Sequence, residues 1–257
     1  MKKAEKRAFC GAWPRIWETA GANALLLAIA LGLFLALGLR SGAAAQASSA
    51  PRTLGGMHAD SEVYKGKKGG KAALLIAVSW NASALPALLD ELGSRGAKAT
   101  FALSPSFVRE NPEALRRIAA EGHEAALAAD GTGAVWGENG GAAGGESGSV
   151  RAALEEAART VRSVCGQAPR LLFTGGDEAL CRAAKALSLT AVRGSVDLIC
   201  ERGSAEEIAS RAVGNISSGD IAVCVPTAAF AGAIGDILDY FSVSGLTAAT
   251  VSGTIYD

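Results

Sequence analysis

Histidine is scarce in this 257-residue chain, which contains only His58 and His123. His58 precedes the region with regular secondary-structure patterns, so a Ser-His-Asp triad or a histidine-rich metal site would depend on His123 alone. The nucleophile pattern GxSxG is also absent, because the segment that begins at Gly145 has serine at its last position. These absences argue against a serine hydrolase and against a metal centre built from several histidines.

The chain also has no excess charge and no paired cysteines. Its 25 basic and 25 acidic residues give a formal net charge of zero, so we expect no nucleic-acid partner. The five cysteines occur singly and without a CxxC pair, which argues against a zinc site and against a disulfide framework. We expect four of them to be small buried side chains, namely Cys165, Cys181, Cys200 and Cys224. A disulfide bridge between two of these four is left open.

One long apolar run occurs near the N-terminus. Residues 20–39 carry no charge and follow a basic segment, and at about 1.5 Å per residue they can cross a hydrocarbon core of about 30 Å. The alternative is a cleaved signal peptide, since Ala43–Ala45 and Ala45–Ala47 both fit an A-x-A cleavage site. The run exceeds the usual signal core of about 7–15 residues, which favours an uncleaved anchor. Either interpretation exports the rest of the chain.

The sequence therefore divides into four parts. We expect a cytoplasmic segment at 1–19, a transmembrane helix at 20–40, a Gly- and Ser-rich linker at 41–62 and one folded domain at 63–257. This arrangement predicts a single-pass membrane protein whose C-terminal domain lies outside the cytoplasm.

Strand and helix patterns alternate through the domain. Residues 72–78 are continuously apolar, as in a strand that is buried on both faces. The expected strands are 72–78, 97–103, 124–128, 170–173, 189–192, 195–199, 221–225 and 246–251, with helical patterns between most of them. This alternation predicts a parallel sheet covered by helices. A sheet of this size can close as a barrel or stay open and doubly wound, and alternation alone does not choose between these two architectures.

Short motifs in a fixed order carry a family resemblance. They are Lys98-Ala-Thr-Phe101, Asn111-Pro112-Glu113, Glu121-Gly-His-Glu124, Ser195-Val-Asp197 and Gly219-Asp-Ile221. Over about residues 63–255, this set resembles the polysaccharide deacetylase (NodB-homology, carbohydrate esterase family 4) domain. Val78-Ser-Trp80 further resembles the sporulation-type branch. The resemblance implies a distorted seven-stranded (β/α) barrel.

The resemblance also implies a chemistry that this sequence does not support. The family hydrolyses the C–N amide bond of N-acetyl groups with a metal held by one Asp and two His, a carboxylate base and a histidine acid. The metal ligands correspond to Ala77, Ala128 and Thr132 here, and the histidine acid corresponds to Val225. We therefore expect no catalytic residue, no metal ligand and no cofactor.

The remaining candidates are binding residues. The resemblance matches Arg170 to the Arg of an R-P-P motif and Asp197 to the first Asp of a D-x-x-D-W motif. We expect both at the carboxyl ends of strands, where they hold a sugar or pair with each other. Trp80 and Trp136 offer indole faces for pyranose stacking, with burial against the barrel rim as the alternative. His123 is expected to be a hydrogen-bonded structural residue rather than a catalytic base.

These observations favour a membrane-anchored extracytoplasmic deacetylase-like protein that is catalytically inactive and binds cell-wall glycan or an envelope protein. One alternative is an active N-deacetylase of peptidoglycan or chitooligosaccharides with a non-standard metal site. Another is a structural or regulatory partner of a true deacetylase. Bound divalent metal is required only by the active enzyme.

Overall fold

The computed structural model describes residues 52–53, 62–79, 83–130 and 147–256. The expected anchor at 20–40 lies outside the described residues, as do Trp80, Thr132 and Trp136. Among the described helices, none combines the length and apolarity needed to cross a bilayer.

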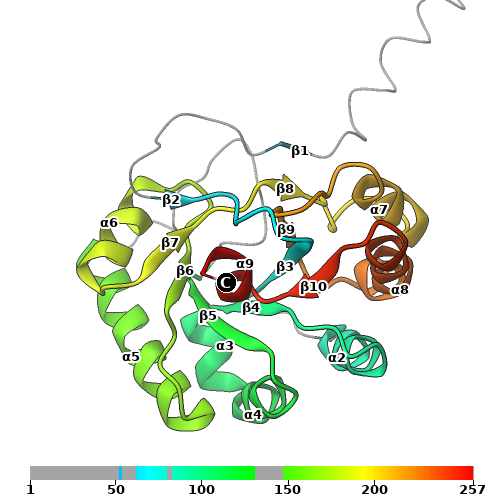
Figure 1. The fold of residues 1–257 in the computed structure, drawn as a ribbon. Coiled ribbons are helices and arrows are strands. Elements are labelled where there is room, and N and C mark those ends of the chain that lie inside the picture. Colours follow the sequence, from blue (N-terminus) through cyan, green and yellow to red (C-terminus); the bar gives the residue numbers. More distant parts are fainter. Residues whose placement is uncertain (1–51, 54–61, 80–82, 131–146, 257) are drawn as a thin grey trace, which may run out of the picture. The chain divides into compact units, whose positions relative to one another are not determined.

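A largely parallel sheet forms the centre of the domain (Figure 1). Its hydrogen-bonded order is β1-β8-β9-β3-β4-β5-β6-β7-β2, with β10 paired to β3. Every ladder is parallel except that of β1 with β8, which confirms the predicted parallel α/β sheet. The strands are β1 (Arg52–Thr53), β2 (Glu62–Val63), β3 (Lys71–Val78), β4 (Thr100–Leu103), β5 (Glu124–Ala128), β6 (Leu171–Phe173), β7 (Thr190–Val192), β8 (Val196–Asp197), β9 (Ile221–Cys224) and β10 (Thr247–Ala249).

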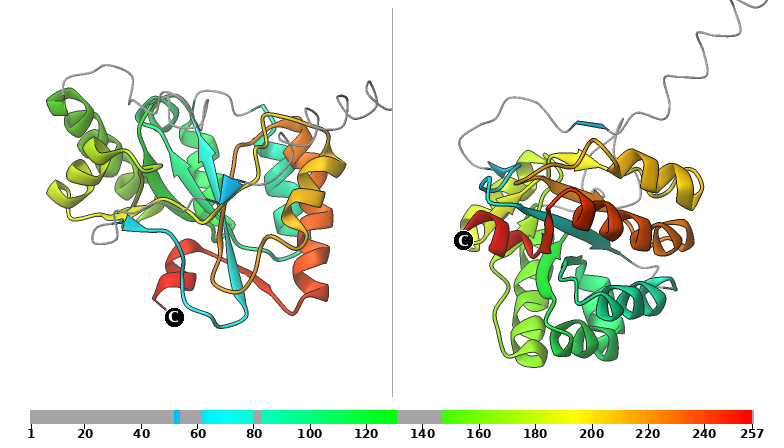
Figure 2. Two further views of the ribbon diagram at one scale, coloured as in Figure 1. Left: turned by 90° about the horizontal axis from the view of Figure 1, so that it is seen from above. Right: turned by 45° about the vertical axis from the view of Figure 1, so that its right-hand side comes forward.

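Most helices cover the outer face of this sheet, and α9 lies within the ring of strands (Figures 1 and 2). The helices are α2 (Leu85–Ser94), α3 (Pro105–Glu110), α4 (Pro112–Ala120), α5 (Ser147–Cys165), α6 (Glu178–Ala186), α7 (Ala205–Ala212), α8 (Ala228–Val243) and α9 (Val251–Ile255). The last expected strand is shorter than predicted, because the Thr250 hydroxyl accepts a hydrogen bond from the Gly253 amide and starts α9.

The two faces of the sheet have different cores. On β3, Leu74 and Ile76 point outward into the large core beneath the helices. The alternate residues point inward into a smaller apolar cluster, which we call the inner cluster. Its buried members are Ala73, Leu75, Ala77, Ala102, Ala126, Ala128, Leu171, Phe173, Val192, Ile221, Val223 and Val251. Alanines therefore fill much of the space inside the curved sheet, and β3 is buried on both faces as predicted.

The sheet curves until its two sides nearly meet. β7 and β8 lie on opposite sides of the sheet path, yet only residues 193–195 connect them. The four peptide steps from Val192 to Val196 cannot span more than about 14 Å. The β2 segment crosses the remaining gap, since Val63 pairs with Val192 and Lys65 forms a bridge with Asp220. The result is a partial α/β barrel, consistent with the distorted barrel that the resemblance implies.

The buried carboxylate of Asp220 joins the segments at this gap. Its Oδ1 accepts hydrogen bonds from Lys65 Nζ at 2.8 Å and from Ser195 Oγ at 2.8 Å. Its Oδ2 accepts from the amide and hydroxyl of Ser217 at 2.9 Å and 2.6 Å. Burial alone would raise the pKa of Asp220, but the Lys65 ammonium and the Ser217 and Ser195 donors outweigh it and lower the pKa. The folded domain therefore favours the ionised carboxylate.

We expect Asp220→Asn to lower the free energy of unfolding by about 2–4 kcal/mol, because it leaves buried donors with a weaker acceptor. A carboxylate with a lowered pKa stabilises the fold above its unfolded pKa of about 3.9, and this contribution is lost as pH falls further. Urea denaturation at pH 7 and between pH 5 and 2 measures both effects. Asp236→Asn, which changes an exposed carboxylate on α8, is the matched control. Equal losses in the two variants would contradict this role for Asp220.

Candidate functional site

The carboxyl edge of the sheet is where α/β barrels place their sites. At this edge, Ala77 near the end of β3 is fully buried and Ala128 at the end of β5 is 1% exposed. Ala77, Ala102 and Ala126 form one row across β3, β4 and β5, and Ala128 lies two residues beyond Ala126. All four side chains belong to the inner cluster. Methyl groups therefore occupy two positions that the resemblance assigns to metal ligands.

The other assigned positions add no catalytic group. Val225 follows β9 and packs against the outer core. Among the described residues, no group of three or more His, Cys, Asp or Glu side chains is placed to hold a metal ion. Alanine and valine neither ligate a metal nor transfer a proton, so these side chains cannot carry out the steps of amide hydrolysis.

Polar side chains remain beside the buried alanines. Asp130, two residues after β5, accepts hydrogen bonds from the Ser106 amide at 3.2 Å and from the Ser106 hydroxyl. The Ser104 and Ser106 hydroxyls are 3.0 Å apart, and Ser104 Oγ also accepts from the Phe107 amide to begin α3. The sequence analysis missed this pair of serines, although their place directly after a strand could have indicated them. The group offers hydroxyl and carboxylate oxygens without a histidine base.

Asp197 lies at the carboxyl end of β8, as predicted, but it is only 4% exposed. Its Oδ1 accepts a hydrogen bond from the Ile199 amide at 2.8 Å. Ile199 has a φ of 49°, a left-handed conformation that is rare for a β-branched residue. Asp197 therefore holds a strained turn at this edge.

Arg170 lies at the opposite edge, so the prediction that it occupies a carboxyl end is wrong. The strand β6 begins only after it, at Leu171, and the residue that follows the carboxyl end is Thr174. The Thr174 hydroxyl contacts the Val192 carbonyl oxygen at 3.1 Å and also bonds to Glu62. Arg170 and Asp197 thus lie at different edges of the sheet and do not pair.

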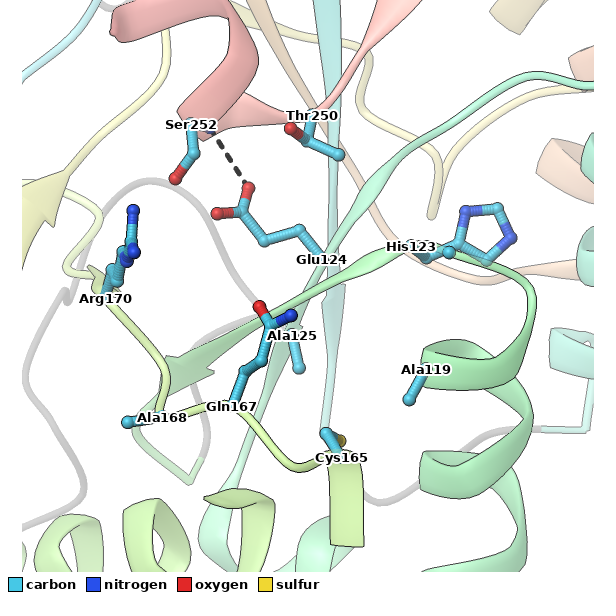
Figure 3. A pocket seen from close by; sticks show the side chains of 11 residues that line it. Ala119, His123, Glu124, Ala125, Cys165, Gln167, Ala168, Arg170, Thr250 and Ser252 are labelled. Atoms are coloured by element: carbon cyan, nitrogen blue, oxygen red, sulfur yellow. Dashed lines mark hydrogen bonds between the residues drawn. The ribbon is translucent and has the colours of Figure 1, made fainter.

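Arg170 instead lines a pocket of about 360 Å³ at the amino edge (Figure 3). Glu124, the first residue of β5, lies across from it, and its Oε2 accepts hydrogen bonds from Thr100 Oγ1 at 2.6 Å and the Ser252 amide at 3.1 Å. The remaining wall comes from α4, the end of α5 and the segment that begins α9. These lining residues are Ala119, Gly122, His123, Ala125, Cys165, Gln167, Ala168, Thr250 and Ser252. In the sequence, Glu124 is recognisable only as the last residue of the Glu121–Glu124 motif, and no local pattern places it beside Arg170.

His123 borders this pocket, but its imidazole points away from it (Figure 3). The side chain is fully buried, its Nδ1 accepts from the Ala99 amide at 3.3 Å, and its ring meets the Phe101 ring edge-on at 5.3 Å. Burial is the largest cause that lowers the pKa of His123, and the nearby Lys98 ammonium lowers it further. These contacts are those of the structural histidine that the sequence predicts.

The described cysteines are free thiols. Cys200 and Cys224 are buried as predicted, whereas Cys165 on α5 and Cys181 on α6 are only partly buried, which differs from the prediction. Burial, together with a hydrogen bond to Glu62, raises the pKa of Cys181 to about 11. Burial likewise raises the pKa of Cys224, so neither thiol is activated as a nucleophile.

Comparison with known proteins adds a fold assignment. No protein-family model and no curated protein matches the sequence. A family 4 carbohydrate esterase (CE4) pseudoenzyme from Bacillus anthracis has a similar structure, with a TM-score of 0.66 and 20% identity over 76% of this chain and 68% of that chain. The domain has the CE4 fold.

Two proteins that are named as enzymes also have this CE4 fold. A peptidoglycan N-acetylglucosamine deacetylase matches with a TM-score of 0.65 and 21% identity, over 75% of this chain and 91% of its own. A family 4 carbohydrate esterase from Bacillus subtilis matches with a TM-score of 0.63 and 17% identity, over 75% of this chain and 84% of its own. These matches confirm a partial α/β barrel of the CE4 type, which is the coarser part of the fold that the sequence motifs imply.

We expect His123 to titrate below the ordinary histidine pKa of about 6.5. Because the unfolded chain then binds a proton that the folded domain does not, stability is retained above about pH 6.5 and declines as pH falls below it. NMR signals of the imidazole rings, followed from pH 8 to 4.5, measure the pKa of each histidine. The signal that disappears in His58→Gln belongs to His58, so the remaining signal is that of His123. A His123 pKa at or above 6.5 would contradict the proposed desolvation.

The assignment of Ala77 and Ala128 to the metal-ligand positions is testable by substitution. Ala77→Asp alone should lower the free energy of unfolding by about 2–5 kcal/mol, because it buries an unpaired carboxyl group among apolar side chains. Adding Ala128→His and Thr132→His should allow one Zn²⁺ to bind and recover stability. Native mass spectrometry and thermal unfolding with and without zinc measure these outcomes.

Ala73→Asp with the same two histidines is the control. Ala73 lies on the same face of β3 but about 13 Å nearer the amino edge. Zinc should not rescue this variant. Equal zinc responses in the two triple variants, or none in either, would refute the positional assignment.

Proposed function

We propose that this chain is a catalytically inactive member of the CE4 family that binds cell-wall glycan. The observation that carries the proposal is the pair of buried alanines, Ala77 and Ala128, at the positions the resemblance assigns to metal ligands. A member of this family that lacks these ligands cannot polarise an acetyl group through the usual metal. The similar B. anthracis structure is itself described as a CE4 pseudoenzyme, which supports the proposal.

The carboxyl edge still offers groups that suit a sugar. The hydroxyls of Ser104 and Ser106 and the carboxylate of Asp130 can exchange hydrogen bonds with sugar hydroxyls without a metal. Trp80 comes two residues after the end of β3 in the sequence, and we propose that its indole stacks on a pyranose ring. Asp197 would support this surface by holding the turn at Ile199. Arg170 is excluded from this surface by its place at the amino edge.

We further propose that residues 20–40 anchor the chain in the membrane and that the domain faces the cell wall. The uncharged run and its basic flank support this orientation. A tethered domain needs little intrinsic affinity, because anchoring raises the effective concentration of its ligand.

The test combines activity and binding on the full chain, purified in detergent. With zinc or cobalt added, we expect no acetate release from acetylated chitooligosaccharides, but co-sedimentation with insoluble peptidoglycan. Trp80→Ala should weaken retention about tenfold through loss of stacking, which corresponds to about 1.4 kcal/mol. Trp13→Ala, outside the domain, should retain full binding.

Two results would refute parts of this proposal. Metal-dependent acetate release would show an active deacetylase with other ligands. A folded chain that peptidoglycan does not retain would exclude glycan binding and favour a protein partner in the envelope.

A further inference from the structure

The amino-edge pocket contains two opposite charges that do not neutralise each other. Arg170 is exposed at its rim, and Figure 3 shows its guanidinium and the Glu124 carboxylate lying on the same cavity. An ion pair requires a nitrogen and an oxygen within 4.0 Å of each other, and no Arg170 nitrogen lies that close to a Glu124 oxygen. Across the described residues, the Arg170 side chain forms neither an ion pair nor a hydrogen bond.

The two carboxylate oxygens of Glu124 have different surroundings. Oε2 is held by the Thr100 hydroxyl and the Ser252 amide, which fixes the carboxylate between β4 and α9. In the described part of the chain, Oε1 has no hydrogen-bond donor. A fixed carboxylate with one unused oxygen is preorganised, so binding a donor there costs little additional side-chain entropy.

The rest of the wall favours a small polar ligand. Alanines and a glycine line part of the pocket, and the Gln167 amide adds a donor and an acceptor. The volume of about 360 Å³ is near the lower end of ligand pockets, which range from about 300 to 1,000 Å³. The Ser252 hydroxyl on the same wall is buried and has no hydrogen-bond partner among the described residues.

The two charges select against ligands with a single charge. An anion on Arg170 is repelled by Glu124, and a cation on Glu124 is repelled by Arg170. A molecule with both an ammonium and a carboxylate satisfies both residues at once. We propose that this pocket binds a small zwitterion, an amino acid or a dipeptide, with its carboxylate on Arg170 and its ammonium on Glu124.

This binding is independent of the glycan surface, because the pocket lies at the opposite edge of the sheet. The experiment is calorimetric titration of the full chain with L-alanyl-L-alanine and with its N-acetyl and C-terminal amide derivatives. We expect the dipeptide to bind and each derivative to bind at least tenfold more weakly, since each lacks one charge. The D,D-dipeptide reports whether the pocket discriminates configuration.

Two variants assign the contacts. Arg170→Gln removes the cation from an exposed position, and Glu124→Gln keeps an oxygen for the Thr100 and Ser252 donors. Each should weaken dipeptide binding at least tenfold. Arg182→Gln, at an exposed arginine on α6, is the matched control and should bind as the unaltered chain does.

Three results would overturn the proposal: no dipeptide binding by the unaltered chain, equal binding of the blocked derivatives, or unchanged affinity in Arg170→Gln. Thermal unfolding establishes that each variant is folded. If Glu124→Gln proves unstable, Arg170→Gln and the blocked ligands decide the question.

Discussion

The closure of the curved sheet depends on one buried carboxylate. Consecutive strands β7 and β8 do not pair in the described structure, so the partial barrel has a gap that its own ladders do not bridge. The segment after β2 crosses the gap, and Asp220 binds donors from that segment, from the β7–β8 connection and from the turn before β9. An ionised carboxylate suits this place because it accepts several hydrogen bonds at once, and a neutral side chain of similar size does not.

The curvature held by this contact limits what the inside of the sheet can contain. Alanine recurs on the inner faces of β3, β4 and β5, and Val251 of α9 is fully buried against them. At Ala77 and Ala128, the side chains that replace expected metal ligands also pack this narrow space. A return to ligating residues therefore exchanges packing for coordination, and an unpaired charge placed there is costly without a metal.

The sequence predicted the individual strands and helices better than the contacts between residues that are distant in the sequence. The apolar run of β3 was recognisable, because a strand that is buried on both faces shows in the local pattern of residues. The six-residue α3 was missed because it spans too few turns to show helical periodicity. Arg170 was assigned to the wrong edge because a motif match does not say on which side of a strand a residue lies. The approach of Arg170 to Glu124 depends on the parallel pairing of β5 with β6, which no local pattern specifies.

The two edges of the sheet divide the polar groups unequally. At the carboxyl edge, where barrels place chemistry, methyl groups fill assigned ligand positions and the carboxylates of Asp130 and Asp197 are engaged in local hydrogen bonds. The amino edge of a barrel usually contributes stability rather than function. One carboxylate oxygen of Glu124 meets that expectation, because its hydrogen bonds connect β4 to α9. The other oxygen faces a pocket that the Arg170 side chain also lines. A structural requirement can thus position a binding group at an edge where the fold does not otherwise demand one.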